Sequence, residues 1–123
     1  MKVKLYAPKE YWRLDEDEKS RICNGCGAKG SALNVFIPQG VFKEACNIHD
    51  YMYHAGESES DKRRADRVFI NNLNRIVEAS DKWLRPFMKI RAKSYYLAVS
   101  KFGDEAFWQG KVVDGMVGKE VKL

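Results

Sequence analysis

A histidine and an aspartate stand side by side in a segment whose spacing predicts a helix. The stretch from 42 to 53, FKEACNIHDYMY, places five side chains on one inward stripe: Phe42, Cys46, His49, Asp50 and Tyr53. Such a stripe is normally aliphatic, and burying an imidazole and a carboxylate is costly unless both are paired or bind a metal. Because these groups can exchange protons or hold a cation, the stripe indicates a functional site.

The glycine-rich stretch before this helix has the composition of a binding loop. Residues Cys23 to Gly30 read CNGCGAKG. Each glycine admits positive φ and leaves backbone amides and carbonyls open to a ligand, so neither a helix nor a strand is expected there.

Two helices that should lie antiparallel would position the site. We expect a short helix over Asp15 to Arg21, a helix over Val41 to His54, a Gly-Glu-Ser-Glu-Ser turn and a second long helix from about Ser60 to Ala79. The core face of that second helix is predicted to be Ala65, Phe69, Leu73 and Ile76. Asp66 lies one step aside from this face and should be half buried.

A third helix should pack on this pair. It would run from about Asp81 or Pro86 to Phe102, because proline is allowed in a first turn and Gly103 supplies a stop. Its packing residues are expected to be Phe87, Ile90, Tyr95, Leu97, Ala98 and Phe102. The tail from Asp104 to Leu123 could hold a short helix or β-turn pieces. The fold class predicted is all-α.

Length and charge limit the possible classes of protein. A chain of 123 residues with 45% hydrophobic content fits one domain, over residues 1–123. A net charge of +5 favours an anionic partner, either nucleic acid or an anionic bilayer. We expect neither a secretory signal nor a transmembrane span, because the sequence has no apolar run suited to either, and therefore a soluble protein or a mature form.

The cysteines allow a rival interpretation. Cys23, Cys26, Cys46 and His49 are spaced as C-x2-C and C-x2-H, a pattern that also fits a structural zinc knuckle. Such a module would bind nucleic acid or protein through its basic helices. It would leave Asp50, Tyr53 and Asp66 without a role.

Taken together, the loop CNGCGAKG, the helix ACNIHDYMY and the following ADRVF resemble calcium-dependent phospholipase A2. The resemblance is closest to the short bacterial and fungal type and to related phage-borne forms, and it covers roughly Cys23 to Leu73. The C-x2-H-D-x2-Y element is moderately specific, because it fixes several positions at once.

The resemblance implies a hydrolase in which His49 is the general base that takes a proton from an attacking water. Asp66 would hold the far nitrogen of the imidazole, and Tyr53 would hydrogen-bond that carboxylate. The expected fold is then two antiparallel helices that carry the site, preceded by a glycine-rich calcium loop, with the third helix packed on them. Asp61 competes with Asp66 for the bracing role, but Asp66 is preferred for its half-buried position.

The same resemblance implies a calcium site and a disulfide. Asp50 would bind Ca²⁺ with loop carbonyls around Gly25, Gly27 and Lys29, and the Gly27 amide would hold the oxyanion formed at the sn-2 ester. Cys26 would pair with Cys46, which leaves Cys23 free. Two departures from the family stand out: Lys29 replaces a usual glycine, and Met52 replaces a common cysteine.

The expected partner is an anionic phospholipid membrane surface, and binding of nucleic acid is not expected. The protein would be secreted by another route, or be cytoplasmic or phage-associated, and act at membranes. Candidates for membrane contact are Trp12, Trp83, Trp108 and Phe36, each of which could equally pack in the core. Two groups are expected at the surface, His54 and the basic cluster of Lys62, Arg63, Arg64 and Arg67. A third possibility is a catalytically idle membrane-binding or partner-binding module.

Overall fold

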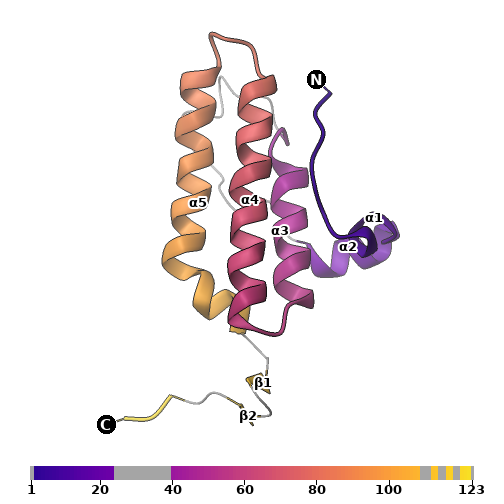
Figure 1. Cartoon of the computed structure of the whole chain (residues 1–123), viewed down its shortest axis with the longest axis vertical. Coiled ribbons are helices and arrows are strands. Elements are labelled where there is room, and N and C mark those ends of the chain that lie inside the picture. Colours follow the sequence, from indigo (N-terminus) through magenta and orange to yellow (C-terminus); the bar gives the residue numbers. More distant parts are fainter. Residues whose placement is uncertain (1, 24–39, 109–111, 114–115, 118–119, 123) are drawn as a thin grey trace.

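The structure is a computed structural model that describes residues 2–23, 40–108, 112–113, 116–117 and 120–122. Within these ranges the regular secondary structure is helical apart from one short pair of strands, so the prediction of an all-α fold is confirmed (Figure 1). The elements follow one another as α1 Lys9–Trp12, α2 Glu16–Ile22, α3 Lys43–Ala55, α4 Glu59–Ala79, α5 Arg85–Trp108, β1 Val112–Val113 and β2 Met116–Val117.

Two capping boxes set where helices begin. Asp15 accepts a hydrogen bond from the backbone N–H of Glu18 at 2.8 Å, and the Glu18 carboxylate accepts from the N–H of Asp15 at 3.2 Å. Ser58 and Asp61 form the same reciprocal pair at the start of α4. Each box satisfies backbone donors that the first turn leaves unpaired, which explains why α2 and α4 begin close to their predicted positions.

Helices α3, α4 and α5 form an antiparallel bundle (Figure 1). Residues 56–58 connect α3 to α4, and residues 80–84 connect α4 to α5. Connections this short require each helix to turn back beside the one before it. Helix α4 therefore lies between the other two and packs against both.

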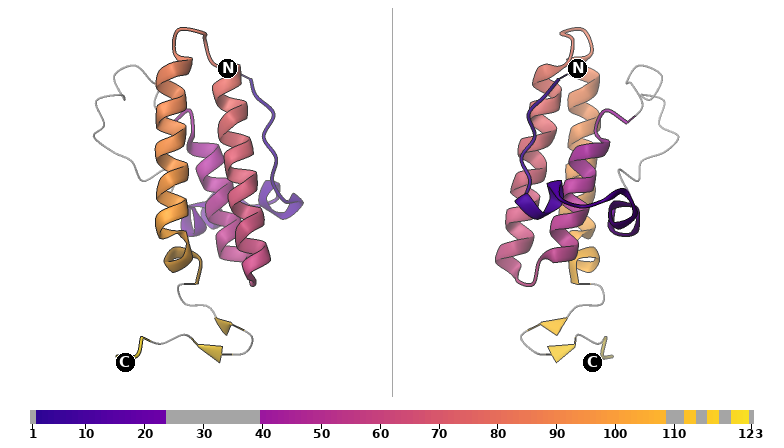
Figure 2. Two further views of the ribbon diagram at one scale, coloured as in Figure 1. Left: turned by 60° about the vertical axis from the view of Figure 1, so that its left-hand side comes forward. Right: turned by 90° about the vertical axis from the view of Figure 1, so that its right-hand side faces the viewer.

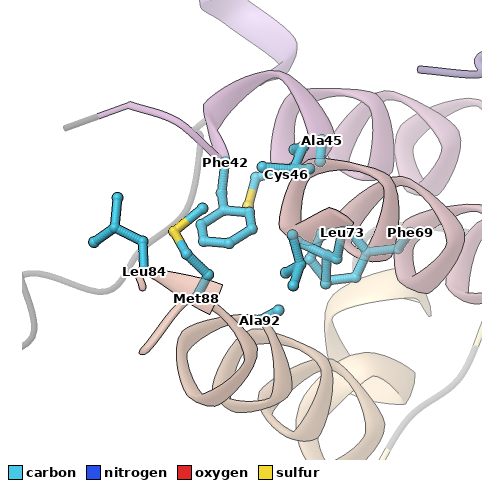
Figure 3. Packing of buried hydrophobic residues seen from close by; sticks show 10 residues of the cluster. Phe42, Ala45, Cys46, Phe69, Leu73, Leu84, Met88 and Ala92 are labelled. Carbon is cyan, nitrogen blue, oxygen red and sulfur yellow. The ribbon is translucent and has the colours of Figure 1, made fainter. Parts of the chain in front are cut away.

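The apolar core fills the space between these three helices. Figure 3 shows Phe42 and Cys46 facing side chains of α4 and of α5. The four residues predicted as the inward face of α4 are all buried: Ala65, Phe69, Leu73 and Ile76. These residues recur every three or four positions on one helical face, and this spacing is why they could be predicted from the sequence.

The N-terminal segment is fixed to α4 by a buried asparagine. The Asn72 side chain accepts from the N–H of Tyr6 at 2.9 Å and donates to the Tyr6 carbonyl at 2.8 Å. Asn72 is fully buried, and the extended segment runs beside α4 (Figure 2). Both polar groups of the amide are thus satisfied where no water reaches them.

Helix α5 does not stop at Gly103 as predicted, but continues to Trp108. Two contacts of its last turns explain the difference. The Tyr53 hydroxyl approaches Gly103 so closely that a Cβ built on the glycine would lie 2.6 Å from it. Phe107, which is fully buried, packs against Gly56 and against the Tyr53 ring. Gly103 is therefore required by close packing within a helix that tertiary contacts prolong.

The predicted inward face of α5 is also wrong in part. Ile90, Leu97 and Phe102 are 57%, 54% and 61% exposed, and Ala98 is exposed as well. Phe87 and Tyr95 are partly buried and do pack on the core, as expected. The inward face is made instead by Met88, Ala92, Val99, Gly103 and Phe107. Apolar residues occur around most of this helix, so their spacing does not define one buried face.

Where a short helix or β-turn pieces were expected, the described part of the C-terminal tail holds the last turns of α5 and one pair of strands. After the last turn of α5, the strands β1 and β2 pair antiparallel, with Val112 opposite Val117 and Val113 opposite Met116. Among the described helices, none is long and apolar enough to cross a membrane.

Candidate active site

His49, Tyr53 and Asp66 meet at the packing face of α3 and α4. The imidazole Nε2 of His49 lies 2.9 Å from Oδ1 of Asp66, and the Tyr53 hydroxyl donates to the same oxygen at 2.6 Å. His49 and Tyr53 are one turn apart on α3, so both side chains project toward the same part of α4. The contacts of His49 and Tyr53 with Asp66 that the resemblance implied are thus present.

The His49 ring is held in a closed apolar setting. It is 5% exposed, and it lies against the rings of Tyr53 and Phe69, with centroid distances of 4.1 Å and 4.5 Å. An ionised carboxylate can only accept hydrogen bonds, so Nε2 carries the hydrogen in the contact with Asp66. In the neutral ring, Nδ1 then keeps its lone pair and can accept a proton.

Asp66 is kept ionised by three donors. Burial of the carboxyl group raises its pKa, but hydrogen bonds from His49, Tyr53 and Lys62 outweigh burial, and the pKa falls below its ordinary value. The pKa of the Tyr53 hydroxyl is raised, first by burial and then by its hydrogen bond to the carboxylate. Tyr53 therefore stays a neutral donor at every physiological pH.

Lys62 belongs to this cluster, although the sequence placed it on a solvated basic face. Its side chain is only 11% exposed, and Nζ lies 3.2 Å from Oδ2 of Asp66 and 3.4 Å from Oδ1 of Asp104. Burial lowers the pKa of the ammonium, but the hydrogen bonds and charges of both aspartates raise it above its ordinary value. The separation of four positions between Lys62 and Asp66 was the available signal.

The other residues of that segment lie where they were expected. Asp61 accepts from the N–H groups of Glu57 and Ser58 and so caps α4, while Asp66 alone of the two contacts His49. The rest of the basic cluster is exposed, namely Arg63, Arg64 and Arg67, and so is His54. Arg63 has its nearest carboxylate, that of Glu59, at 3.9 Å.

Of the residues predicted to bind calcium, Asp50 is the one that lies within the described ranges of the structure. It is partly exposed and follows His49 on α3. The pKa of the Cys23 thiol is raised by burial and, next, by the negative charge of Asp50. The carboxylate oxygens of Asp50 are the donors that Ca²⁺ prefers. The other predicted ligands, Gly25, Gly27 and Lys29, lie outside the described residues.

The cysteines do not assemble the alternative zinc site in the part of the chain that is described. Cys23 is a free thiol that donates to the Asn47 carbonyl at 3.3 Å, and Cys46 lies in the apolar core. Within the described ranges, no three Cys, His, Asp or Glu side chains are grouped so that they could hold a metal ion. Cys26 lies outside those ranges, so its pairing with Cys46 stays a prediction.

The aromatic residues predicted to touch a membrane differ in exposure. Trp12 and Trp83 are 53% and 64% exposed. Trp108 is partly buried, and its indole N–H donates to Glu59 at 2.9 Å. Phe36 lies outside the described residues.

Comparisons of the chain with protein-family models, with curated proteins and with solved structures found no match. Any assignment of function thus rests on the residues and on the geometry of the cluster.

Proposed function

We propose that the protein is a calcium-dependent hydrolase of the phospholipase A2 type, which cleaves the sn-2 ester of glycerophospholipids at a membrane interface. The contact of His49 and Tyr53 with a single oxygen of Asp66 carries the proposal. Polar side chains are unusual on the otherwise apolar inward face of α3. A catalytic imidazole that is held in place by a carboxylate would explain why they are there.

In this mechanism His49 acts as general base toward water. Nδ1 takes a proton as the water attacks the ester carbonyl, and it returns that proton to the leaving alcohol oxygen as the ester C–O bond breaks, which releases the fatty acid and the lysophospholipid. The Nε2–H bond to Asp66 fixes the ring and stabilises the imidazolium between the two steps. Tyr53 and Lys62 hold the carboxylate in place from two further directions. No serine or cysteine nucleophile is required.

The proposal includes a calcium site formed by Asp50 and the carbonyls of Gly25, Gly27 and Lys29. Bound Ca²⁺ would polarise the ester carbonyl and, together with the Gly27 amide, balance the charge of the oxyanion. A disulfide between Cys26 and Cys46 would tie the loop that carries these carbonyls to α3. The site is then a glycine-rich calcium loop followed by two antiparallel helices, with α5 packed on them.

The two histidines of the chain allow a matched test. His49→Gln should lower fatty-acid release by about 10²–10⁴-fold, because it removes the general base. His54→Gln makes the same chemical change on the same helix at an exposed position and should leave release unchanged. Circular dichroism of both variants would show that the fold is kept. Full activity of His49→Gln would refute the mechanism.

A further inference from the structure

Helix α5 and the turn before it expose four large apolar side chains. Ile90 and Leu97 are seven positions apart, so they lie on the same side of the helix, whereas Phe102 lies roughly a third of a turn or more around the helix from both. Trp83 precedes the helix and is more exposed than any of these. Single exposed apolar residues are ordinary, but this concentration on one element indicates a surface that contacts something.

Residues 82–103 carry the net positive charge of the whole chain. They contain six Lys or Arg and no Asp or Glu, whereas the turn before them contains Asp81 and the last turns of α5 contain Asp104 and Glu105. Without those six, the chain has 16 basic residues against 17 acidic ones. The four lysines among them are all exposed: Lys82, Lys89, Lys93 and Lys101.

We infer that the surface formed by Trp83, Ile90, Leu97 and these four lysines, here called the α5 face, docks the protein on an anionic lipid bilayer. Lysine ammonium groups can reach phosphate headgroups while their stems lie along the apolar boundary, where Trp83, Ile90 and Leu97 would lose contact with water. A second copy of this chain would bring one set of lysines against another, so charge disfavours self-association through this face. The inference deepens the proposed function and rests on it for its substrate.

The C-terminal part of α5 contacts the candidate active site. Gly103 lies against the Tyr53 hydroxyl, and Asp104 binds Lys62, which in turn binds Asp66. Helix α5 is an outer helix of the bundle, as Figure 1 shows. A bilayer on its exposed face would therefore hold the His49 cluster at a fixed distance and orientation through one rigid element.

The test is binding of the full chain to vesicles in the presence of a calcium chelator, measured by sedimentation. Vesicles of phosphatidylcholine alone should bind weakly, and vesicles containing phosphatidylglycerol should bind more tightly in a salt-dependent way. The double variant Lys89→Gln with Lys93→Gln should lower the partition coefficient roughly 25-fold, since each lysine near an anionic surface contributes about fivefold.

Matched controls separate this face from overall charge. Arg64→Gln with Arg67→Gln removes the same charge from exposed positions on α4 and should change binding much less. Trp83→Ala should weaken binding, whereas Trp12→Ala removes an exposed tryptophan of α1 and should not. Equal losses in the two charge pairs would overturn the inference. So would an unchanged partition coefficient in Trp83→Ala.

Two further outcomes distinguish this inference from the proposed function. Charge-dependent binding through the α5 face with no fatty-acid release in calcium would support the docking surface and contradict the hydrolase. Fatty-acid release that is indifferent to the lysine and tryptophan variants would overturn the docking surface alone. Preferential, α5-dependent binding of an oligonucleotide with no binding to vesicles would assign the face to nucleic acid and overturn the inference.

Discussion

Asp66 is the residue on which the proposed chemistry depends most. Its carboxylate accepts from an imidazole, a phenol and an ammonium group, and its side chain is only 17% exposed. A half-buried carboxylate with fewer donors would tend to take up a proton and lose its hold on the ring. The three donors keep it charged, which lets it orient His49 and stabilise an imidazolium.

Removing one of the three donors to Asp66 should change both the free energy of unfolding and its dependence on pH. Lys62→Met takes away the ammonium group from Oδ2 of Asp66, and we expect the free energy of unfolding to fall by about 1–3 kcal/mol at neutral pH. Because the pKa of Asp66 is lowered in the folded protein, its contribution is present above the ordinary aspartate pKa and is lost as the pH falls through the lowered value. Without Lys62 the folded pKa moves back up, so the remaining contribution is smaller and is lost at a higher pH.

Urea unfolding at a series of pH values from neutral down to strongly acidic would measure this. Arg63→Met is the control, because it deletes a neighbouring cation that is exposed and 3.9 Å from Glu59. Such surface pairs contribute little, so the control should follow the wild type. Equal pH profiles for Lys62→Met and the wild type would show that Lys62 does not sustain the charge of Asp66.

The resemblance to phospholipase A2 implied that His49, Tyr53 and Asp66 would lie close together, and the residue spacing was compatible with that expectation. His49 and Tyr53 are one helical turn apart on α3. Asp66 was preferred over Asp61 because its position on α4 was expected to be half buried. Lys62 was missed because a run of basic residues usually indicates a solvated face. Only the fold shows that Asp104 of α5 approaches from the other side and helps to enclose the ammonium group.

At the scale of the elements, the fit of α5 against α3 depends on Gly103. Alanine favours a helix over glycine by about 1 kcal/mol, but here its Cβ would lie 2.6 Å from the Tyr53 hydroxyl. We expect Gly103→Ala to be destabilising and to lower activity, because it displaces Tyr53 from Asp66. In a Tyr53→Phe background, which lacks the hydroxyl, the same change should be neutral or stabilising.

This double-mutant cycle can be measured by thermal unfolding of the four proteins. Non-additivity of about 0.5–3 kcal/mol is expected for residues in direct contact. An effect of Gly103→Ala that is the same in both backgrounds would contradict the close approach.

The attachment of the N-terminal segment to α4 should depend on Asn72. Asn72→Ala leaves the N–H and C=O of Tyr6 without their partners, and we expect a loss of about 1–3 kcal/mol in the free energy of unfolding. Asn74→Ala, at an exposed position on the same helix, should change it by less than about 0.5 kcal/mol. Chemical denaturation measures both, and equal effects would mean that the amide does not secure the segment.

Element boundaries were predictable where local chemistry sets them. Asp15 and the serine at position 58 are N-cap residues, and their helices begin beside them. The end of α5 was not predictable, because the contacts of Phe107 and Gly103 come from residues about fifty positions earlier in the chain. Its buried face was misjudged for a related reason, since the apolar residues on its outer side have no partner within the bundle.

At the scale of the whole molecule, α4 has three structural roles. It buries the core against α3 and α5, it secures the N-terminal segment, and it supplies Asp66 to the histidine of α3. The all-α bundle was predictable from helical periodicity. The segment proposed to bind calcium precedes this bundle in the chain, and Asp50 would complete that site from α3.

The central claim is calcium-dependent hydrolysis, and the most direct test is fatty-acid release from mixed phospholipid vesicles by the purified protein. Release would be followed with Ca²⁺ present and with a calcium chelator, and the position of the cleaved ester would be determined. The proposed mechanism predicts release from the sn-2 position only when Ca²⁺ is present. Absence of release under both conditions, or equal release in the chelator, would contradict it.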